Sequence, residues 1–415
     1  MANIHSNKFN SEKYTFLIAW ALCGKRILSG VSGATAVPVQ AEGVEMADTR
    51  LKVGIIGAGT IANGAHIPAW KDQPSVEIVG VADSAPDNAR STALRHQIAF
   101  STDSVQELLE KTGPDAVSIC APVHCHREHA VAALRSGAHV LCEKPLALTS
   151  ADAAEMFREA ERAKRHLLVG QSMRFYNQMV AAKDFAASGE LGEIYCADAA
   201  RIRRRGVPSH GVFTMKSLSG GGVLYDLGVH MLDTLLWIMG NPRVVTATGA
   251  TFTKIANRNE GLIISDAESG APVGVFNRKA DPAGFDVEDM ASAFLRLENG
   301  AVMSLRVSWA ANAPDDAGGI YIMGTGGGLF FDPRVLALRL VKNMGRYQVD
   351  VTPKLPSPVP NHPFYAHWKE IAHFVRAIRG EEEPCVRRDE ALNVLRAIEA
   401  IYQSAAEGRE VRLSG

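Results

Sequence analysis

The sequence predicts an α/β protein in two parts, a doubly wound parallel sheet with its helices and then an α+β domain with a large, mostly antiparallel sheet. Between residues 51 and 170, short apolar strands alternate with helical segments, as in parallel sheets that helices cover on both faces. Beyond residue 171 the strand-like runs are longer, and the Asn-Gly hairpin signal stands at residues 299–300. We therefore place one domain at 51–170 and the other at 171–415.

The elements follow in order along the chain. Apolar runs predict parallel strands at 51–57, 75–83, 115–122, 138–145 and 166–171. The helices between them are expected at 84–97, 104–113, 126–137 and 150–165, and several end at a glycine or a basic residue. The second part has strand-like runs at 193–202, 243–254, 291–310 and 319–333, then helices at 365–380 and 389–408. The C-terminal helices, 362–408, are expected to pack back on the first domain.

Composition narrows the class of protein. The 415 residues are 47% hydrophobic and carry a formal net charge of −1, so bulk electrostatics indicate neither a nucleic-acid nor a membrane partner. The six cysteines form no Cys-x-x-Cys pair, which favours reduced thiols in a cytoplasmic protein. The basic run from Arg201 to Gly206 would suit a phosphorylated or acidic substrate. Short charged runs are more often a solvated strand end, and we interpret this one in that way.

Residues 1–50 are expected to be an extension outside the fold. Their apolar run "YTFLIAWALCG" is too short to span a membrane. The charged "GKRILSG" follows it directly, where a secretory signal peptide would need its cleavage region. A natural start at Met46 would make the preceding residues an artefact. We interpret the segment as a start-site artefact or a disordered extension.

A dinucleotide-binding fingerprint follows the first strand. Gly57-x-Gly59-x-x-Ala62 stands between a strand and a helix, where the glycines allow a tight turn and a close approach of the backbone to a pyrophosphate. Asp83 ends the second strand, 24 residues after Gly59, where a carboxylate accepts from the adenosine ribose hydroxyls. This predicts a Rossmann domain that binds NAD rather than NADP, with Thr60 and Ile61 as further contacts. Asp83 could instead cap the next helix.

Two further motifs carry ionisable groups suited to chemistry. "LCEKPLA" places Lys144 at the carboxyl end of the fifth strand, where open α/β sheets bind their ligands. "GGGVLYDLGVHMLD" sets Asp226 and His230 four residues apart on a helix, so that they share one face. The alternatives are a surface lysine and a structural histidine held by its neighbouring carboxylate.

Together these motifs resemble the glucose–fructose oxidoreductase, inositol dehydrogenase and rhizopine catabolism family (Gfo/Idh/MocA). The resemblance runs from Leu51 to the end and rests on "GIIGAGTIA", "CAPVHCHREHA", "EKP", "GQSMRF", "GGGVLYDLGVHMLD" and "IEAIYQSAAEGREV". It implies hydride transfer between nicotinamide and a secondary hydroxyl of a sugar or cyclic polyol, and assembly as a homodimer or homotetramer. One departure is Ala121-Pro122-Val123, where the family often has Thr-Pro-Asn, so a polar cofactor contact is expected to be lost.

The resemblance also implies the roles of residues. Lys144, Asp226 and His230 match the family's catalytic set, with His230 as general base and Lys144 stabilising the developing alkoxide. Asp226 would orient the imidazole or bind a neighbouring substrate hydroxyl, and Asp233 would support it or be structural. The expected cofactor contacts are Gly57, Gly59, Thr60, Ile61, Ala62, Asp83, Pro122, His126, Glu143 and Lys144. The substrate candidates are Arg174, Tyr176, His210, Asp226 and His230, with Trp309 considered beside them.

Other functions stay open at this point. Some relatives use retained NAD for a transient oxidation in glycoside cleavage, and a non-catalytic dinucleotide sensor can share the fold. No metal site is predicted, because the histidines and cysteine of "VHCHREH" find no second ligand pair at a matching spacing.

Overall fold

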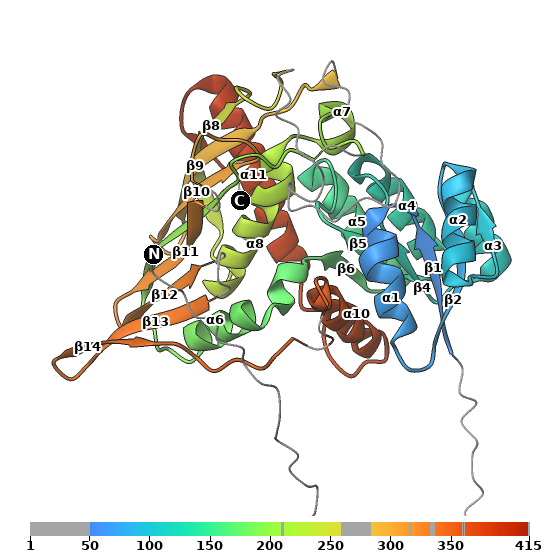
Figure 1. The fold of residues 1–415 in the computed structure, drawn as a ribbon, viewed down its shortest axis with the longest axis horizontal. Coiled ribbons are helices and arrows are strands. Elements are labelled where there is room, and N and C mark those ends of the chain that lie inside the picture. Colours follow the sequence, from blue (N-terminus) through green and yellow to red (C-terminus); the bar gives the residue numbers. More distant parts are fainter. Residues whose placement is uncertain are drawn as a thin grey trace, which may run out of the picture. The chain divides into compact units, whose positions relative to one another are not determined.

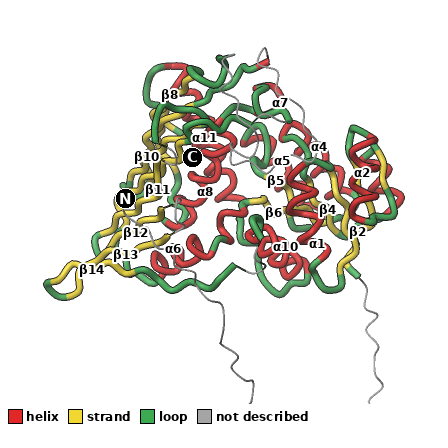
Figure 2. Tube along the Cα trace, viewed as in Figure 1, coloured by secondary structure: helices red, strands yellow, loops and turns green. Residues whose placement is uncertain are grey.

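The computed structural model describes residues 50–208, 211–258, 284–314, 317–332, 337–358, 360 and 362–413 (Figures 1 and 2). The predicted N-terminal extension lies outside these residues, except for Arg50 at its end. Over the described residues, no helix combines the length and the apolar character that a membrane span needs.

The first sheet is six-stranded and parallel, with the strand order β3-β2-β1-β4-β5-β6. Its strands are β1 (Leu51–Ile56), β2 (Val76–Ala82), β3 (Ser101–Thr102), β4 (Ala116–Ile119), β5 (His139–Glu143) and β6 (Leu167–Gly170). The order runs outward in both directions from β1 and β4, so the loops after these two strands diverge and leave room for a ligand. The predicted doubly wound sheet is confirmed, with β3 as the strand that the sequence did not indicate.

Helices connect these strands. A π-helical turn, Ala62–His66, leads into α1 (Ile67–Lys71), and the others are α2 (Pro86–His96), α3 (Val105–Thr112), α4 (Val123–Arg135) and α5 (Ser150–Ala163). Ser104 and Thr149 cap α3 and α5 by accepting hydrogen bonds from the backbone N–H groups of Glu107 and Asp152. α4 begins three residues before the predicted start at His126, because Pro122 serves as its N-cap.

The second sheet has nine strands in the order β14-β13-β12-β11-β7-β10-β9-β8-β15. The strands are β7 (Ile194–Ile202), β8 (Val244–Phe252), β9 (Met290–Leu297), β10 (Val302–Ser308), β11 (Ala317–Gly324), β12 (Gly327–Asp332), β13 (Ala337–Met344), β14 (Tyr347–Val351) and β15 (Val411–Arg412). Among the described strands of this sheet, only β7 and β10 pair in parallel. The Asn-Gly signal marks the β9–β10 hairpin, where Gly300 has a φ of 86°. The predicted mostly antiparallel sheet is therefore confirmed.

Helices of the second part cover one face of this sheet. Those that contact its strands are α6 (Asn177–Ala187), α8 (Val229–Ile238) and α11 (Arg388–Glu407). The short α7 (Lys216–Ser219) contacts α4, and α10 (Tyr365–Ile378) lies against the part that carries the parallel sheet. α8 packs on β7, and α11 packs on both α8 and β8 (Figure 1). α11 also contacts α5, while α10 packs against α1 and the π-helical turn before it. The closing helices thus contact the part that carries the parallel sheet.

Two hydrophobic cores underlie this arrangement. One surrounds the parallel sheet and takes in Trp368, Ile371 and Phe374 from α10. The other lies between the nine-stranded sheet and α8, with Leu232 and Leu235 as members. Side chains for chemistry therefore come from the carboxyl edge of the first sheet and from the helices on the inner face of the second. The domain boundary at residue 170 stays a prediction.

Candidate active site

The glycine turn after β1 has the geometry that a dinucleotide needs. Gly57 has a φ of 92°, and a Cβ there would lie 2.7 Å from the backbone of Cys120 and Ala121, so only glycine fits. A Cβ on Gly59 would meet no atom within 4 Å and would project into the open space that a pyrophosphate would occupy. The residues of this turn therefore fit NAD.

Asn63, which the sequence did not indicate, holds the turn in shape. Its buried side-chain amide donates to the carbonyl oxygens of Ala58 at 2.8 Å and Gly59 at 3.0 Å. The same amide contacts the hydroxyl of Thr92 on α2 at 3.1 Å. A polar residue within an otherwise apolar helix start was the signal that could have revealed it.

Asp83 lies directly beside the glycine turn. Its carboxylate accepts from the N–H of Ala58 at 2.7 Å and from the N–H of Ala85 at 2.9 Å. Ala85, not Asp83, is the N-cap residue of α2, so the alternative interpretation as a helix cap is wrong. The negative charge at the end of β2 is well placed for ribose hydroxyls and unfavourable for a 2′-phosphate.

The structure brings Lys144 and Asp226 together from opposite parts of the chain. Lys144 follows β5 and precedes a cis peptide bond to Pro145. Its Nζ lies 3.2 Å from Asp226 Oδ1 and donates to the Asp226 carbonyl at the same distance. Trp309 Nε1 donates to the other carboxylate oxygen at 2.9 Å. Burial opposes ionisation of Asp226, but the positive charges of Lys144 and Arg203 and the bond from Trp309 outweigh it and lower its pKa to about 2.

His230 lies beside this pair without being bonded to Asp226. The Asp226 carboxylate binds Lys144 and Trp309. It does not orient the imidazole, which was one of the two roles expected for it. Nδ1 of His230 is buried and finds no hydrogen-bond partner among the described residues. Burial and the charge of Lys144 hold the pKa of His230 well below its usual value, so the ring is neutral.

The helix that carries these residues starts irregularly. Asp226 lies in a π-helical turn, Leu224–Gly228, which runs directly into α8. The carboxylate of Glu288 accepts from the N–H groups of Gly222 at 3.0 Å and Leu224 at 2.9 Å, and so replaces a local helix cap. A Cβ on Gly222 would lie 2.0 Å from the Glu288 carbonyl oxygen, which explains that glycine.

Arg174 does not contact this site, contrary to the prediction that it binds substrate. It is 3% exposed, and its guanidinium pairs with Asp233 at 2.7 Å and with Glu390 at 2.8 Å. A further hydrogen bond goes to the carbonyl of Cys385. With these donors engaged, Arg174 joins α8 and α11 to the turn after β6. Asp233 has the structural role that we considered for it.

The other substrate candidates have mixed outcomes. Tyr176 is mostly buried, and its ring packs edge-on against Tyr365, with centroids 5.3 Å apart. Trp309 is fully buried and reaches the site through its bond to Asp226. His210 lies outside the described residues.

His126 and Glu143, two of the predicted cofactor contacts, bind backbone groups of the loops after β4 and β5. The ring nitrogens of His126 lie 2.9 Å from the Pro145 carbonyl and 2.7 Å from the Ala121 carbonyl, so this buried ring joins the loops after β4 and β5. Glu143 accepts from the backbone N–H of Lys144 at 3.0 Å. Pro122, another predicted contact, is exposed at the start of α4.

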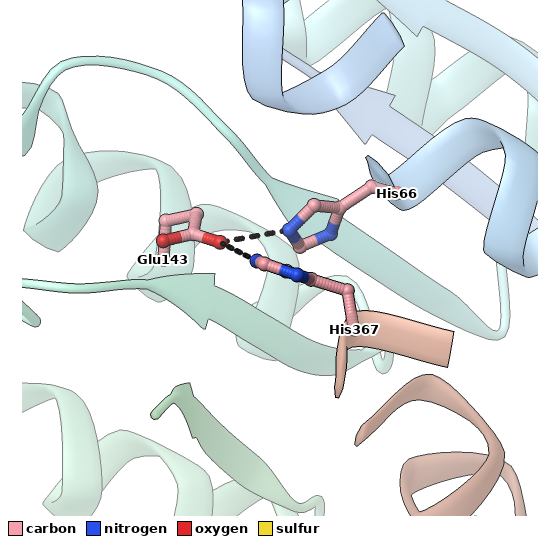
Figure 3. A group of neighbouring side chains, drawn as sticks. All are labelled: His66, Glu143 and His367. Carbon is pink, nitrogen blue, oxygen red and sulfur yellow. Dashed lines mark hydrogen bonds and ion pairs between the residues drawn. The ribbon is translucent and has the colours of Figure 1, made fainter. Parts of the chain in front are cut away.

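Glu143 also lies in a buried cluster with His66 and His367 (Figure 3). The Oε1 atom of Glu143 is 2.9 Å from Nε2 of His66 and 3.9 Å from Nε2 of His367. Burial raises the pKa of Glu143, but the hydrogen bond and charge of His66 outweigh it and bring it to about 2. The spacing of these atoms would admit a cation. We treat the group as a hydrogen-bonded cluster, because His66 also contacts Ser118 at 2.7 Å and Glu143 is committed to Lys144.

Comparisons with known proteins agree with this geometry. The Gfo/Idh/MocA family description "Oxidoreductase family, NAD-binding Rossmann fold" matches residues 51–171, and "Oxidoreductase family, C-terminal alpha/beta domain" matches residues 183–413. D-glucoside 3-dehydrogenase of Escherichia coli is 30% identical over 369 residues, which are 89% of this chain and 99% of that protein. Glucose-6-phosphate 3-dehydrogenase of Bacillus subtilis is 30% identical over 52% of this chain and 61% of its own length.

The solved structures show the same fold. A levoglucosan dehydrogenase in complex with NADH and levoglucosan superposes with a TM-score of 0.73 at 23% identity, over 88% of this chain and all of that one. A levoglucosan dehydrogenase of Pseudarthrobacter phenanthrenivorans is also a sequence relative, 26% identical over 68% of this chain and 73% of its own.

Proposed function

This chain belongs to the Gfo/Idh/MocA family of NAD-binding oxidoreductases, and on that basis we propose that it transfers hydride between a secondary hydroxyl of a sugar or cyclic polyol and NAD. The relatives named above act on a glucoside, on glucose 6-phosphate and on levoglucosan, all of which are sugars or sugar derivatives. The observation that carries the proposal is the contact of Lys144 with Asp226, 3.2 Å apart and beside His230.

The proposed mechanism divides the work among three side chains. Bound NAD would supply the hydride acceptor. His230, whose ring is neutral, takes the hydroxyl proton through Nε2, because Nδ1 is buried. Lys144, held by Asp226, donates to the substrate oxygen and stabilises the negative charge that develops there. Asp226 keeps the ammonium group in place and takes no proton itself.

The test is an NAD reduction screen of the purified protein. Glucosides, aldoses, inositols and anhydrosugars would be offered with NAD or NADP, and NADH formation would be followed by its absorbance. We expect turnover with NAD and its loss in Lys144→Ala, with binding of NAD retained. Unchanged turnover in Lys144→Ala would contradict the mechanism. Bound NAD without net reduction would instead favour a glycosidase with retained cofactor or a dinucleotide sensor.

We also propose assembly as a homodimer or homotetramer through the outer face of the nine-stranded sheet. Large apolar side chains on this sheet are exposed, among them Tyr195, Phe252, Phe294, Tyr321 and Val341. An exposed apolar surface of this kind marks an association site. Light scattering coupled to size-exclusion chromatography checks it, and a monomer at micromolar concentration would contradict it.

A further inference from the structure

The basic run from Arg201 to Gly206 begins inside β7 and continues beyond its end, so its arginines lie in different surroundings. Side chains in a strand alternate between its two faces, and Ala197 and Ala199 are buried on the face that α8 covers. Arg201 is two residues further along the same strand, paired with Val307 and Gly318 of its neighbours, so it shares that inner face. Arg204, beyond the end of β7, is exposed. The predicted solvated strand end thus describes Arg204 but not Arg201.

The inner face at this point adjoins the catalytic residues. The pKa of His230 is lowered by burial, by Lys144 and also by the positive charge of Arg201. The pKa of Tyr176 is raised by burial, and the charge of Arg201 opposes that change. α8 carries His230 and packs on β7, so a side chain on the inner face of this strand is on the side of that helix. The charge of Arg201 therefore acts on both rings. Arg203 acts on Asp226 in the same way. The positive charge of the run is therefore directed at the site.

Arg201 differs from the buried Arg174 in its partners. Arg174 is neutralised by two carboxylates, Asp233 and Glu390. Arg201 is half-buried, yet no carboxylate within the described segments forms an ion pair with it. The negative charge of Asp226 is already engaged by Lys144. A half-buried charge without a counter-charge is costly, and an anionic ligand would offset that cost.

We propose that Arg201 binds an anionic group of the substrate, so that this enzyme acts on a sugar or polyol that carries a phosphate or a carboxylate. The inference rests on the proposed function, because it assumes that the substrate lies against His230 and Lys144. The cofactor is not the source of this anion. Its pyrophosphate would lie at the glycine turn after β1, and its nicotinamide end, beside Lys144, carries no phosphate. Arg201 is thus a specificity-determining residue.

The experiment compares neutral and anionic substrates of one scaffold. Glucose, glucose 6-phosphate and glucuronate would be offered to the NAD-loaded protein, and kcat/KM measured for each. We expect the anionic sugars to exceed glucose by about 10–100-fold, as for one charge-assisted contact. Arg201→Met, which keeps the apolar stem, should abolish that preference, and Arg201→Lys should restore part of it. Arg204→Met is the matched control, from the same run but exposed, and should keep the preference.

The outcomes separate the two proposals. A phosphate preference over glucuronate identifies a phosphorylated substrate, and the reverse identifies a sugar acid. Equal kcat/KM for neutral and anionic sugars, or a preference that survives Arg201→Met, overturns the role of Arg201. If no sugar is oxidised although NAD binds, the proposed function fails. Calorimetric titration of glucose 6-phosphate into wild type, Arg201→Met and Arg204→Met then tests the anion site alone: binding lost only in Arg201→Met supports it, and any other pattern overturns it.

Discussion

Replacing Asp226 by asparagine should remove both stability and turnover, because this carboxylate has two structural partners. Asparagine has nearly the same shape and can still accept from Trp309 through its oxygen. Its amide nitrogen would then face the Lys144 ammonium, which now sits 3.2 Å from a carboxylate oxygen. Two donors would meet where a donor and an acceptor meet in the wild type. The substitution therefore removes charge without opening a cavity.

The magnitude follows from the pKa of Asp226, about 2 against the usual 3.8. A difference of nearly two pH units corresponds to roughly 2–3 kcal/mol of folding free energy. Because the folded-state pKa is the lower one, this contribution is complete above about pH 4. It disappears as the pH falls through about 2. The deficit of Asp226→Asn should thus be the same at pH 7 and at pH 5.

Urea unfolding at both pH values measures that deficit, and kcat measures the chemistry. We expect kcat to fall by about 10²-fold or more, as when a positioned charge-stabilising donor is lost. The dissociation constant of NAD should change little, because the glycine turn belongs to the other sheet. Asp198→Asn is the control, since Asp198 lies on the outer side of β7 and should affect neither quantity. Full stability and full turnover in Asp226→Asn would refute the reasoning.

Three further predictions concern other parts of the fold. Arg174→Met should destabilise the protein by about 3–5 kcal/mol in urea unfolding, because Asp233 and Glu390 lose their counter-charge. A stable variant that has lost only turnover would restore Arg174 as a substrate residue. Gly59→Val should weaken NAD binding by about 100-fold or more, because the valine side chain would fill the open space of the turn. A fluorescence titration measures the binding, and the melting temperature should not change. Tight binding of NAD to this variant would place the pyrophosphate elsewhere. Glu370→Leu should stabilise the protein by about 1–3 kcal/mol near pH 8 and by less near pH 5. Burial and the charges of Glu143 and Asp233 raise the pKa of Glu370, and neither of its oxygens has a partner within the described residues. Thermal melts at both pH values check this, and destabilisation would reveal an unseen partner.

The sequence indicated those features that depend on local pattern. Apolar strands alternating with capped helices predict the parallel sheet, because short-range propensity and burial agree there. The glycine fingerprint and the acidic end of β2 locate the cofactor turn for the same reason. β13 and β14 were not indicated, because β14 is largely exposed and the alternation of β13 between buried and exposed residues covers only its first half, where Leu338 and Leu340 are buried. Strands of this kind are defined by pairing with their neighbours.

Side-chain partners across long separations could not be predicted. The spacing of Asp226 and His230 suggested a bonded pair, yet the carboxylate turns to Trp309, 83 residues away, and to Lys144, 82 residues away. Arg174 looked like a substrate ligand because its two counter-ions, one of them 216 residues distant, are invisible in a linear sequence. Glu288 gave no signal at all, since its role as a cap exists only after β9 and the start of α8 meet.

Lys144 is held at both ends: Glu143 binds its backbone N–H group, and Asp226 binds its ammonium group. Glu143 is the last residue of β5 and is ionised, with a pKa of about 2, because His66 holds its carboxylate. The same carboxylate accepts from the backbone N–H of Lys144, which fixes the chain where the lysine leaves the sheet. His126 holds the next turn by its contact with the Pro145 carbonyl. The lysine is therefore set between a buried anion at its backbone and a second anion, Asp226, at its ammonium group. A point charge on a flexible stem is positioned only when both ends are held, and this arrangement holds both.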